Sequence, residues 1–346
     1  MTIATGRKAS LRRATAADRP LVYAWLVESD LTPNRMGLPL YPDHPPPSYA
    51  QFSEDYEPYF FEGSRPFDGR GLVIRTEGAD VGFIAHRRID LRRDVVELDL
   101  WLAGRRHGGR GLGSEALALA CEWLQENFGV NRFVLRPSRR NVRAVRAIRR
   151  AGFRETDLPA HEVIAQLGLS APRYFDEVLL FCVLPPPPGQ LERDDDRVYV
   201  FVDSEFTSLD EPRLISVGAV ATDSAAFYCE LSDWPEEHCS EFVRASVLPQ
   251  LEGGAISRPV AADAFARWLA ERAASAPVTI VSDSGFDRWA LADLLGREDL
   301  PAGAEWRQVP LDVERLDDSA RALGLRRHHA LNDARALRHA LLGAAS

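Results

Sequence analysis

The stretch "DVVELDLWLAGRRHGGRGLGSEALALACEWLQENFG", residues 94–129, indicates the fold of the first half of the chain. Its first part alternates apolar and polar side chains, as expected for a strand: Val96, Leu98 and Leu100 against Glu97, Asp99 and Trp101. A glycine-rich turn follows, and then a helical pattern carried by Leu117, Ala120, Cys121 and Leu124. Such a loop presents unpaired backbone N–H groups at a helix start, so the stretch predicts a phosphate-binding unit.

The residues on either side of this unit predict a mixed α/β domain. Residues 8–15 are a strand candidate, and residues 16–29 have a helical pattern that Thr15 can cap. Residues 71–89 contain two strands joined by a short turn. Further on, "LRPSRRNVRAVRAIRRAGFRE", residues 135–155, combines an arginine-rich helical pattern with a terminal glycine.

These motifs resemble those of GNAT-family acetyltransferases over most of residues 10–184. The loop from Gly109 to Gly113 is similar to the family's acetyl-CoA pyrophosphate loop, and Asn141 with Gly152-Phe153 matches its later signature. "ELDLWL" and residues 137–153 resemble the subgroup that contains aminoglycoside six-prime N-acetyltransferases. The resemblance implies acetyl-CoA as co-substrate, bound by these residues: Gly109, Arg110, Gly111, Leu112, Gly113, Ser114 and Asn141.

Acetyl transfer requires that the amine acceptor lose a proton, and a carboxylate on the strand before the loop can accept it. Asp99 is the first candidate and Glu97 the second. The alternative is that both acids form the solvent-facing side of a half-exposed strand. The chain departs from the family pattern where Gly108 stands at the usual Gln or Arg. It departs again at Ile148, which stands at the tyrosine that protonates the thiolate.

Length and charge predict two domains. A chain of 346 residues exceeds the size of one ordinary core, and residues 185–197, "PPPPGQLERDDDR", read as a stiff, charged linker. Residues 1–184 carry 26 basic and 23 acidic side chains, whereas residues 185–346 carry 16 and 28. We therefore expect domains at residues 1–184 and 198–346, the second too acidic for a broad nucleic-acid footprint.

Composition favours a cytoplasmic protein without a membrane segment. The sequence is 45% hydrophobic and 27% charged, and no apolar stretch approaches the roughly 20 residues needed to cross a bilayer. The amino-terminal residues are basic but lack the apolar core of a secretory signal. The four cysteines are widely spaced and form no CxxC, which suits reduced thiols.

The second half begins with a paired carboxylate motif, "VYVFVDSEFTSLD", residues 198–210. Side chains alternate along a strand, so Asp203 and Glu205 lie on one face and Ser204 on the other. Adjacent anions repel each other, and a divalent cation is the usual means of neutralising them. The alternative for an isolated pair is a strand end whose acids meet solvent.

Two later segments add an acid each, Asp287 after a predicted strand at residues 278–281 and Asp333 in the last helix. His328 precedes Asp333 by five residues, so the two cannot share a helix face and His328 is expected on the entering loop. His329 is expected at the surface. The set Asp203, Glu205, Asp287, Asp333 and His328 resembles the DEDDh 3′–5′ exonucleases, a group that includes oligoribonuclease and proofreading domains.

This second resemblance implies a ribonuclease H-like domain that binds the 3′ end of short or single-stranded nucleic acid. Two Mg²⁺ or Mn²⁺ ions would be held by Asp203, Glu205, Asp287 and Asp333, with His328 deprotonating the attacking water. Asp283 stands where the family has Asn, so it is an alternative third carboxylate. The chain is thus expected to be α/β throughout, an α+β acetyltransferase domain followed by a mixed-sheet exonuclease domain. In the alternative, only the exonuclease is catalytic and the first half binds coenzyme A or regulates.

Overall fold

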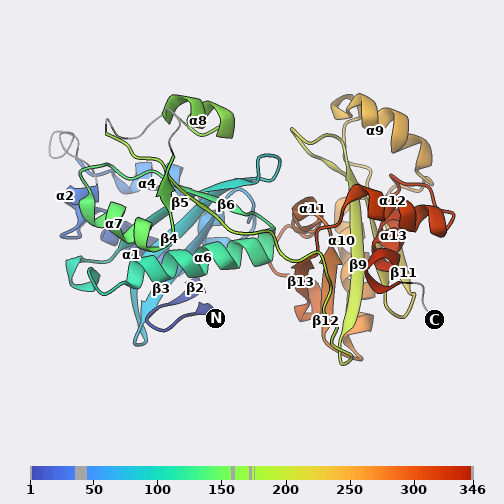
Figure 1. The fold of residues 1–346 in the computed structure, drawn as a ribbon, viewed down its shortest axis with the longest axis horizontal. Coiled ribbons are helices and arrows are strands. Elements are labelled where there is room, and N and C mark those ends of the chain that lie inside the picture. The colour runs from blue at the N-terminus through green and yellow to red at the C-terminus, as the bar shows by residue number, and fades with distance from the viewer. Residues whose placement is uncertain (1, 36–44, 157–159, 171–173, 175, 344–346) are drawn as a thin grey trace. The chain divides into compact units, whose positions relative to one another are not determined.

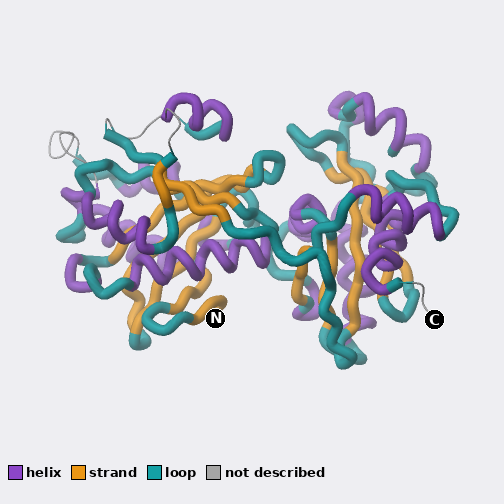
Figure 2. The backbone as a smooth tube through the Cα atoms, viewed as in Figure 1, coloured by secondary structure: helices purple, strands orange, loops and turns teal. Residues whose placement is uncertain are grey.

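The computed structural model describes residues 2–35, 45–156, 160–170, 174 and 176–343. The chain divides into two compact units, one formed by Met1–Gln125 with Val130–Pro185, the other by Glu126–Gly129 with Pro186–Ser346. Each unit contains a mixed sheet and helices (Figure 1), and the strands of both are orange in Figure 2. The predicted α/β class is therefore confirmed. No described helix combines the length and apolar character needed to cross a membrane.

The first unit is built on an eight-stranded sheet in the order β1-β2-β3-β4-β5-β6-β8-β7. The strands are β1 Thr2–Thr5, β2 Ser10–Arg13, β3 Arg70–Thr76, β4 Ala79–Asp90, β5 Val95–Leu102, β6 Arg132–Leu135, β7 Arg154–Glu155 and β8 Leu180–Val183. The helices are α1 Arg19–Val27, α2 Thr32–Arg35, α4 Tyr49–Asp55, α5 Tyr59–Glu62, α6 Leu112–Phe128, α7 Val142–Arg150 and α8 Ala160–Leu167.

The parallel pair β5–β6 positions the glycine-rich loop. All other neighbouring strands in this sheet are antiparallel, so α6 is the crossover that joins the parallel pair. The loop therefore leaves the carboxyl end of β5 and enters the amino end of α6. This is the arrangement in which helix N–H groups are available to a ligand.

The second unit is built on a five-stranded sheet in the order β11-β10-β9-β12-β13. The three strands β9, β10 and β11 are antiparallel, whereas β12 runs parallel to β9 and β13 parallel to β12. The strands are β9 Val198–Phe206, β10 Leu214–Ala221, β11 Ala226–Glu230, β12 Val278–Ser282 and β13 Glu305–Gln308. The helices are α9 Glu241–Ser246, α10 Arg258–Ala273, α11 Gly285–Leu295, α12 Val313–Ala322 and α13 Ala330–Leu342.

Helices cover both faces of this sheet, as Figure 1 shows around β9. Val200 and Val202 of β9 pack in one core cluster with residues of α10 and α11. Tyr199 and Phe201, which alternate with them, pack in another cluster with residues of α12 and α13. Because both faces of β9 are buried, its run of apolar residues ends only where Asp203 begins the polar motif.

Gly218 of β10 brings α13 close to the sheet. It is paired in register with Asp203 of β9, and a Cβ at this position would overlap the backbone of Ala330 and Leu331. Only glycine permits so close an approach between a strand and the first turn of a helix. This contact fixes where the loop before α13 lies relative to Asp203.

Candidate functional site

The glycine-rich loop of the first unit has two left-handed residues, Gly109 (φ 78°) and Gly111 (φ 83°). Glycine adopts this conformation at little cost, and side chains with a Cβ do so at a cost of about 1–2 kcal/mol. The two turns lead the chain into α6, whose first N–H groups lack intrahelical partners. The loop thus has the geometry of an anion-binding turn.

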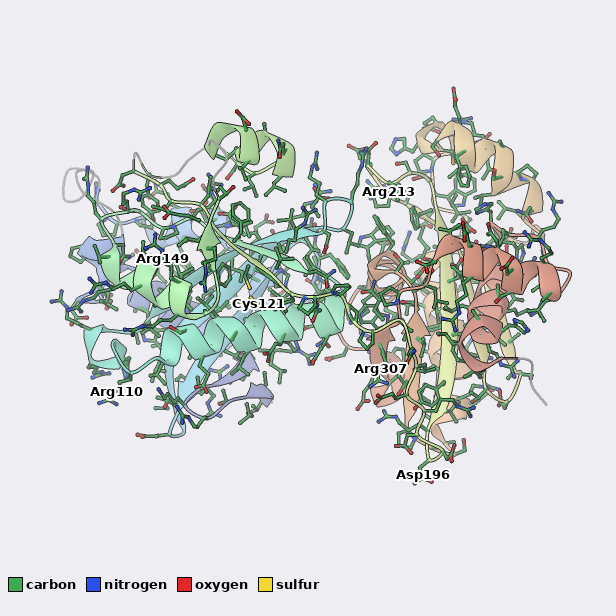
Figure 3. All side chains as sticks on the ribbon, in the orientation of Figure 1. Arg110, Cys121, Arg149, Asp196, Arg213 and Arg307 are labelled. Carbon is green, nitrogen blue, oxygen red and sulfur yellow. The ribbon has the colours of Figure 1, made fainter. Side chains whose placement is uncertain are left out.

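A cavity of about 460 Å³ lies beside this loop. Its lining residues are Arg7, Lys8, Gly109, Arg110, Gly111, Ser114, Glu115, Ala118, Arg150 and Ala151. Among the described residues, its four cationic side chains form no ion pair, and one of them, Arg110 of the loop, is labelled in Figure 3. The Glu115 carboxylate accepts N–H groups of Arg7, Lys8 and Ala9 at 2.7–2.9 Å, so it holds the cavity wall together.

The predicted coenzyme-binding residues divide into two groups. Four of them line the cavity: Gly109, Arg110, Gly111 and Ser114. Leu112, Gly113 and Asn141 do not line it. Leu112 is buried, Gly113 lies within α6, and the Asn141 side chain caps α7 by accepting the N–H of Ala144 at 3.2 Å. Asn141 therefore has a helix-capping role in this structure.

Asp99 of β5 lies in a polar network within the first unit. Its carboxylate accepts the Tyr56 hydroxyl at 2.9 Å and pairs with Arg87 Nε at 2.9 Å. The Arg87 guanidinium also lies over the Tyr56 ring, 5.1 Å from its centroid. A carboxylate held by a guanidinium and a hydroxyl is fixed in one orientation.

Glu97, the second candidate base, is buried rather than solvent-facing. It is 8% exposed and pairs with Arg136, which in turn pairs with Glu177 at 2.8 Å. Trp101 on the same face is 5% exposed. The alternative of a half-exposed strand with a wet acidic face is therefore wrong for these positions. Buried acids of this kind are paired because an isolated charge in the interior is costly.

In the second unit the sequence-predicted acids lie close together. One ligand atom each of Glu205, His328 and Asp333 lie within 4.8 Å of one another. A second group with the same spacing contains Asp203, Asp283 and Asp287. Asp283 and Asp287 thus both belong to the cluster, which joins the ends of β9 and β12 with α11 and the loop before α13.

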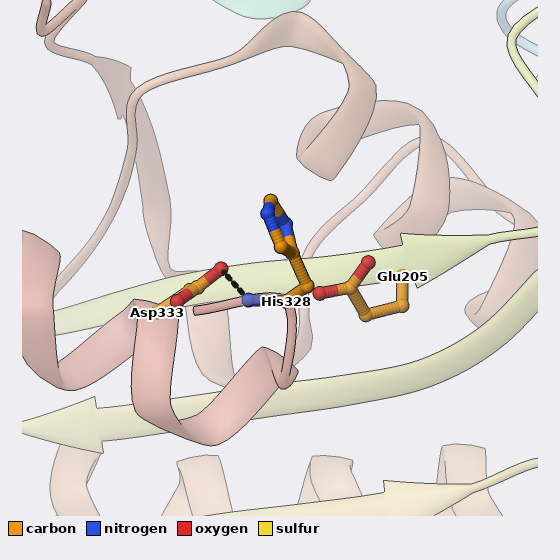
Figure 4. A group of neighbouring side chains, drawn as sticks. All are labelled: Glu205, His328 and Asp333. Atoms are coloured by element: carbon orange, nitrogen blue, oxygen red, sulfur yellow. Dashed lines mark hydrogen bonds between the residues drawn. The ribbon is translucent and has the colours of Figure 1, made fainter. Parts of the chain in front are cut away.

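His328 lies on the loop that enters α13 (Figure 4). Its backbone is left-handed (φ 67°), an uncommon conformation for a residue with a side chain. The His328 N–H donates to Asp333 Oδ2 at 2.9 Å, and Gln250 Nε2 donates to the His328 carbonyl at 3.0 Å. These contacts hold the histidine beside Glu205 and Asp333.

Burial raises the pKa of all five carboxyl groups: Asp203, Glu205, Asp283, Asp287 and Asp333. For Asp203 and Asp287 the pKa lies well above its ordinary range, and neighbouring acids add to the rise. Burial, together with the charge of Asp333, raises the pKa of Glu205 to about 8. The site is therefore a dense anionic cluster that does not tolerate all of its charges without compensation.

The donor set fits a hard divalent cation. Asp287 is 3% exposed, and its Oδ2 has no hydrogen-bond partner among the described residues. Its Oδ1 accepts the Ser204 hydroxyl at 2.7 Å, so the side chain is fixed while the second oxygen stays unsatisfied. Carboxylate oxygens are the ligands that suit Mg²⁺ or Mn²⁺.

Comparison with known proteins identifies the first unit. Residues 9–154 match the sequence profile of a family described as "Acetyltransferase (GNAT) domain". Residues 9–154 are a GNAT acetyltransferase domain. A comparison of the chain with curated proteins found no match.

Solved structures similar to the chain include three acetyltransferases. AAC(6')-Ib in complex with paromomycin and acetyl-CoA is 19% identical, covers 51% of this chain and 94% of its own, with a TM-score of 0.40. Spermidine N-acetyltransferase from Vibrio cholerae is 16% identical, and the match covers 51% of this chain and 95% of that protein, with a TM-score of 0.39. The ribosomal L7/L12 alpha-N-protein acetyltransferase RimL is 14% identical, and the match covers 53% of this chain and 98% of that protein, with a TM-score of 0.42.

Within the GNAT domain, Ile148 is 4% exposed and packs on the buried side of α7. An alkyl side chain has no proton to give, so this position supplies no acid for a thiolate. The cavity is also bordered by two groups that sequence analysis did not select, Arg7 and Lys8. Arg7 and Lys8 lie more than 100 residues before the loop, in the turn between β1 and β2, and their backbone N–H groups donate to Glu115 of α6.

Sequence analysis also missed residues of the acidic cluster. Gln250 donates to the loop that carries His328, and the Phe242 ring lies 4.9 Å from the imidazole in an edge-on contact. Arg327, on the same loop, donates to Asp333. Isolated polar or aromatic residues of this kind have no spacing signal. Gly218 did have one, because a single glycine inside a strand pattern indicates close backbone approach.

The expectation that His329 lies at the surface is wrong. It is 7% exposed, and its ring stacks on Tyr228 of β11 at 4.5 Å. Its Nε2 lies 3.4 Å from Glu252. The His329 side chain is therefore held between Tyr228 of β11 and Glu252.

The raised carboxyl pKa values predict how stability depends on pH without metal. Glu205 binds a proton in the folded state up to about pH 8 but in the unfolded chain only up to its ordinary 4.5. The folded state holds more protons in this window, so the free energy of unfolding falls as pH rises from 4.5 to 8. In EDTA, the thermal midpoint of the second unit should fall across this range. With Mn²⁺ the fall should be smaller, and an unchanged midpoint in EDTA would contradict the prediction.

Proposed function

We propose that the chain combines two activities, an acetyl-CoA-dependent N-acetyltransferase in its first unit and a metal-dependent 3′–5′ exonuclease in residues 198–346. The convergence of five acids and His328 from three separate segments is the observation that carries the nuclease proposal. The sheet order β11-β10-β9-β12-β13 supports a ribonuclease H-like fold, since the first three strands form an antiparallel meander and the next two are parallel.

In phosphodiester hydrolysis, the acids and His328 would have different roles. Asp203, Glu205, Asp287 and Asp333 would bind two Mg²⁺ or Mn²⁺ ions, with Asp283 as a further ligand. When bound, the ions supply charge that makes water more acidic and offsets the charge on the leaving 3′ oxygen. His328 would accept the proton of the attacking water, because its imidazole lies beside Glu205 and Asp333.

The substrate would be the 3′ end of a short or single-stranded nucleic acid. The acidic second half offers no broad cationic surface for a duplex. Aromatic and apolar groups lie just beyond the acids: Phe206 stacks on Phe286 at 5.2 Å, and Leu209 is 52% exposed. Such groups suit contact with an unstacked terminal base.

The nuclease proposal is tested with the full-length chain and 3′-labelled RNA and DNA oligomers of equal sequence. Mononucleotides released from the 3′ end in Mg²⁺ or Mn²⁺, and not in EDTA, are the expected product. Parallel 5′-labelled substrates distinguish stepwise shortening from internal cleavage. The absence of hydrolysis of both nucleic acids in either metal would contradict the proposal.

In the GNAT domain, acetyl-CoA would bind with its phosphates in the cationic cavity beside the loop. Asp99 would accept the proton of an amine acceptor, with Tyr56 and Arg87 holding its carboxylate. The apolar Ile148 and the ion pair at Asp99 favour a second candidate, a domain that binds the coenzyme but transfers acetyl groups slowly or not at all. Binding without turnover over a panel of amines would support that candidate.

Gly111→Ala should lower acetyl-CoA affinity by at least about tenfold, on the order of 1.4 kcal/mol. The added Cβ would lie 3.2 Å from Lys8 Nζ, against a wall of the cavity, and strain a backbone at φ 83°. Calorimetric titration and a melting curve on the same variant measure the two effects separately.

Gly78→Ala is the matched control for this variant. Gly78 has φ 81° in the turn between β3 and β4, and a Cβ there meets nothing within 4 Å. It should therefore lower the unfolding midpoint through strain alone and leave acetyl-CoA affinity unchanged. If both variants bind acetyl-CoA equally well, the loop is only a structural turn.

A further inference from the structure

One wall of the cavity in the GNAT domain comes from the turn between β1 and β2, residues 6–9. β1 is an edge strand of its sheet, and each of the two strands has only four residues. A short edge hairpin has few partners that could fix the position of its turn. Arg7 and Lys8 of this turn line the cavity, so their placement there needs a contact beyond the sheet.

Glu115, in the first turn of α6, supplies that contact. Its carboxylate accepts the backbone N–H groups of Arg7 at 2.8 Å, Lys8 at 2.7 Å and Ala9 at 2.9 Å. Hydrogen bonds to an ionised acceptor are stronger than neutral ones, and here three of them converge on one side chain. Gly6 packs so closely that a Cβ on it would lie 2.9 Å from Glu115 Cδ. The turn is thus fastened to the helix that follows the glycine-rich loop.

An acid in the wall of a cationic cavity opposes the binding of an anion, unless its charge serves another purpose. The side chains that Glu115 positions have donors available for a ligand. Lys8 Nζ donates to the Arg110 carbonyl at 3.1 Å, which leaves the other N–H donors of the ammonium group. The Arg7 guanidinium is exposed and forms no ion pair or hydrogen bond among the described residues.

Arg7 and Lys8 add to a site that suits a pyrophosphate without them. The backbone N–H groups of the loop and of the first turn of α6 are the usual partners of that group. The two cations come from a different segment of the chain and border the same cavity, which predicts a second anionic group on the ligand. Coenzyme A has one in its 3′-phosphate, a monoester with a charge of about −1.5 to −2 at pH 7.

We propose that the turn at residues 6–9 binds the 3′-phosphate of coenzyme A through Arg7 and Lys8, and that Glu115 is the positioning residue that holds the turn at the cavity. The inference rests on the proposed binding of acetyl-CoA beside the glycine-rich loop. It gives the site a specificity: the GNAT domain should distinguish coenzyme A from dephospho-coenzyme A, which has the same pyrophosphate and lacks only the 3′-phosphate.

Calorimetric titration of the full-length chain with each of these two ligands tests the assignment. The wild type should bind coenzyme A at least about tenfold more tightly, on the order of 1.4 kcal/mol. Arg7→Gln should weaken coenzyme A binding at least about fivefold and change dephospho-coenzyme A affinity by less than about twofold. Arg88→Gln is the matched control, because Arg88 is an exposed arginine of β4 that does not line the cavity. It should change neither affinity.

Glu115→Gln separates positioning from simple charge. Removing a negative charge from the wall would by itself tighten the binding of any anion. The Gln amide, however, has a single acceptor oxygen and would turn its NH₂ group toward a backbone N–H, so the turn should move away. Coenzyme A binding should therefore weaken at least about fivefold, while dephospho-coenzyme A binding stays unchanged or tightens. Tighter coenzyme A binding, or an equal loss for both ligands, would contradict the positioning role.

Melting curves establish whether Glu115→Gln is folded, and the exposed Arg7→Gln variant keeps the proposal testable if it is not. If Arg7→Gln weakens both ligands equally, the turn contacts the pyrophosphate and the 3′-phosphate assignment is wrong. Equal affinities of the wild type for the two ligands, or no effect of Arg7→Gln, would also overturn that assignment but leave the coenzyme site intact. A wild type that binds neither ligand would overturn the proposed coenzyme site, and this inference with it.

Discussion

Asp203→Asn should abolish the metal-dependent release of nucleotides from the 3′ end of an oligonucleotide while leaving the second unit folded. Asn has nearly the same shape as Asp but only one oxygen and no charge, so the site loses its central anion. We expect activity to fall by at least about a thousandfold, on the order of 4 kcal/mol. Single-turnover assays with 3′-labelled substrate measure the loss.

The same substitution should raise the stability of the metal-free protein. Burial, together with the charges of Asp287, Asp333, Glu205 and Asp283, disfavours the ionised form of Asp203, and Asn has no ionised form. In EDTA at pH 8 the variant should therefore melt at a higher temperature than the wild type. Glu211→Gln, an exposed acid on the loop after β9, is the control and should change neither property. Hydrolysis by Asp203→Asn at the wild-type rate would end the proposed assignment of the site.

Gly218→Ala should be among the most destabilising single substitutions in the second unit. The new Cβ would overlap the backbone of Ala330 and Leu331, and neither strand nor helix can relieve that overlap by a side-chain rotation. We expect a loss of about 3 kcal/mol in the free energy of unfolding. Because α13 must shift away from β10, Mn²⁺ binding should weaken as well. Chemical denaturation and calorimetry measure the two effects.

Gly253→Ala is the control that separates the cost of steric overlap at Gly218 from the cost of backbone strain alone. Gly253 has φ 84°, and a Cβ there meets nothing within 4 Å, so only backbone strain of about 1 kcal/mol is expected. The loss at Gly218 should exceed the loss at Gly253 by at least about twofold. Equal losses would mean that α13 can move without cost, and that its distance from β10 is not fixed by this glycine.

The elements that carry the acidic cluster could be read from local sequence patterns. Strands at residues 198–206 and 278–282 are apolar runs that end in acids, and α13 begins after a histidine pair. The burial of Glu97 could not be foreseen, because it depends on Arg136, which lies 39 residues away and reaches it only through the pairing of β5 and β6. His329 was misjudged for a similar reason, since its partner Tyr228 lies on β11, about 100 residues earlier in the chain.

The contacts that orient the cluster depend on tertiary structure in the same way. Gln250 lies 78 residues before His328, yet its amide holds the carbonyl of that residue. Arg327 adjoins the histidine in sequence, but its second partner Asp317 comes from α12. Periodicity reports which face of an element is buried, whereas it does not report which polar side chains from distant segments will meet there.

The two faces of β9 have a mechanical consequence at its carboxyl end. Along most of the strand, the sheet separates α11 from α13. Apolar residues of α11 pack on one face of β9, and apolar residues of α13 pack on the other. Near Asp203 and Ser204, at the carboxyl end of β9, Asp287 of α11 and Asp333 of α13 belong to one acidic cluster. A cation held there would cross-link the two helical layers, so their local opening motions would become a single cooperative event.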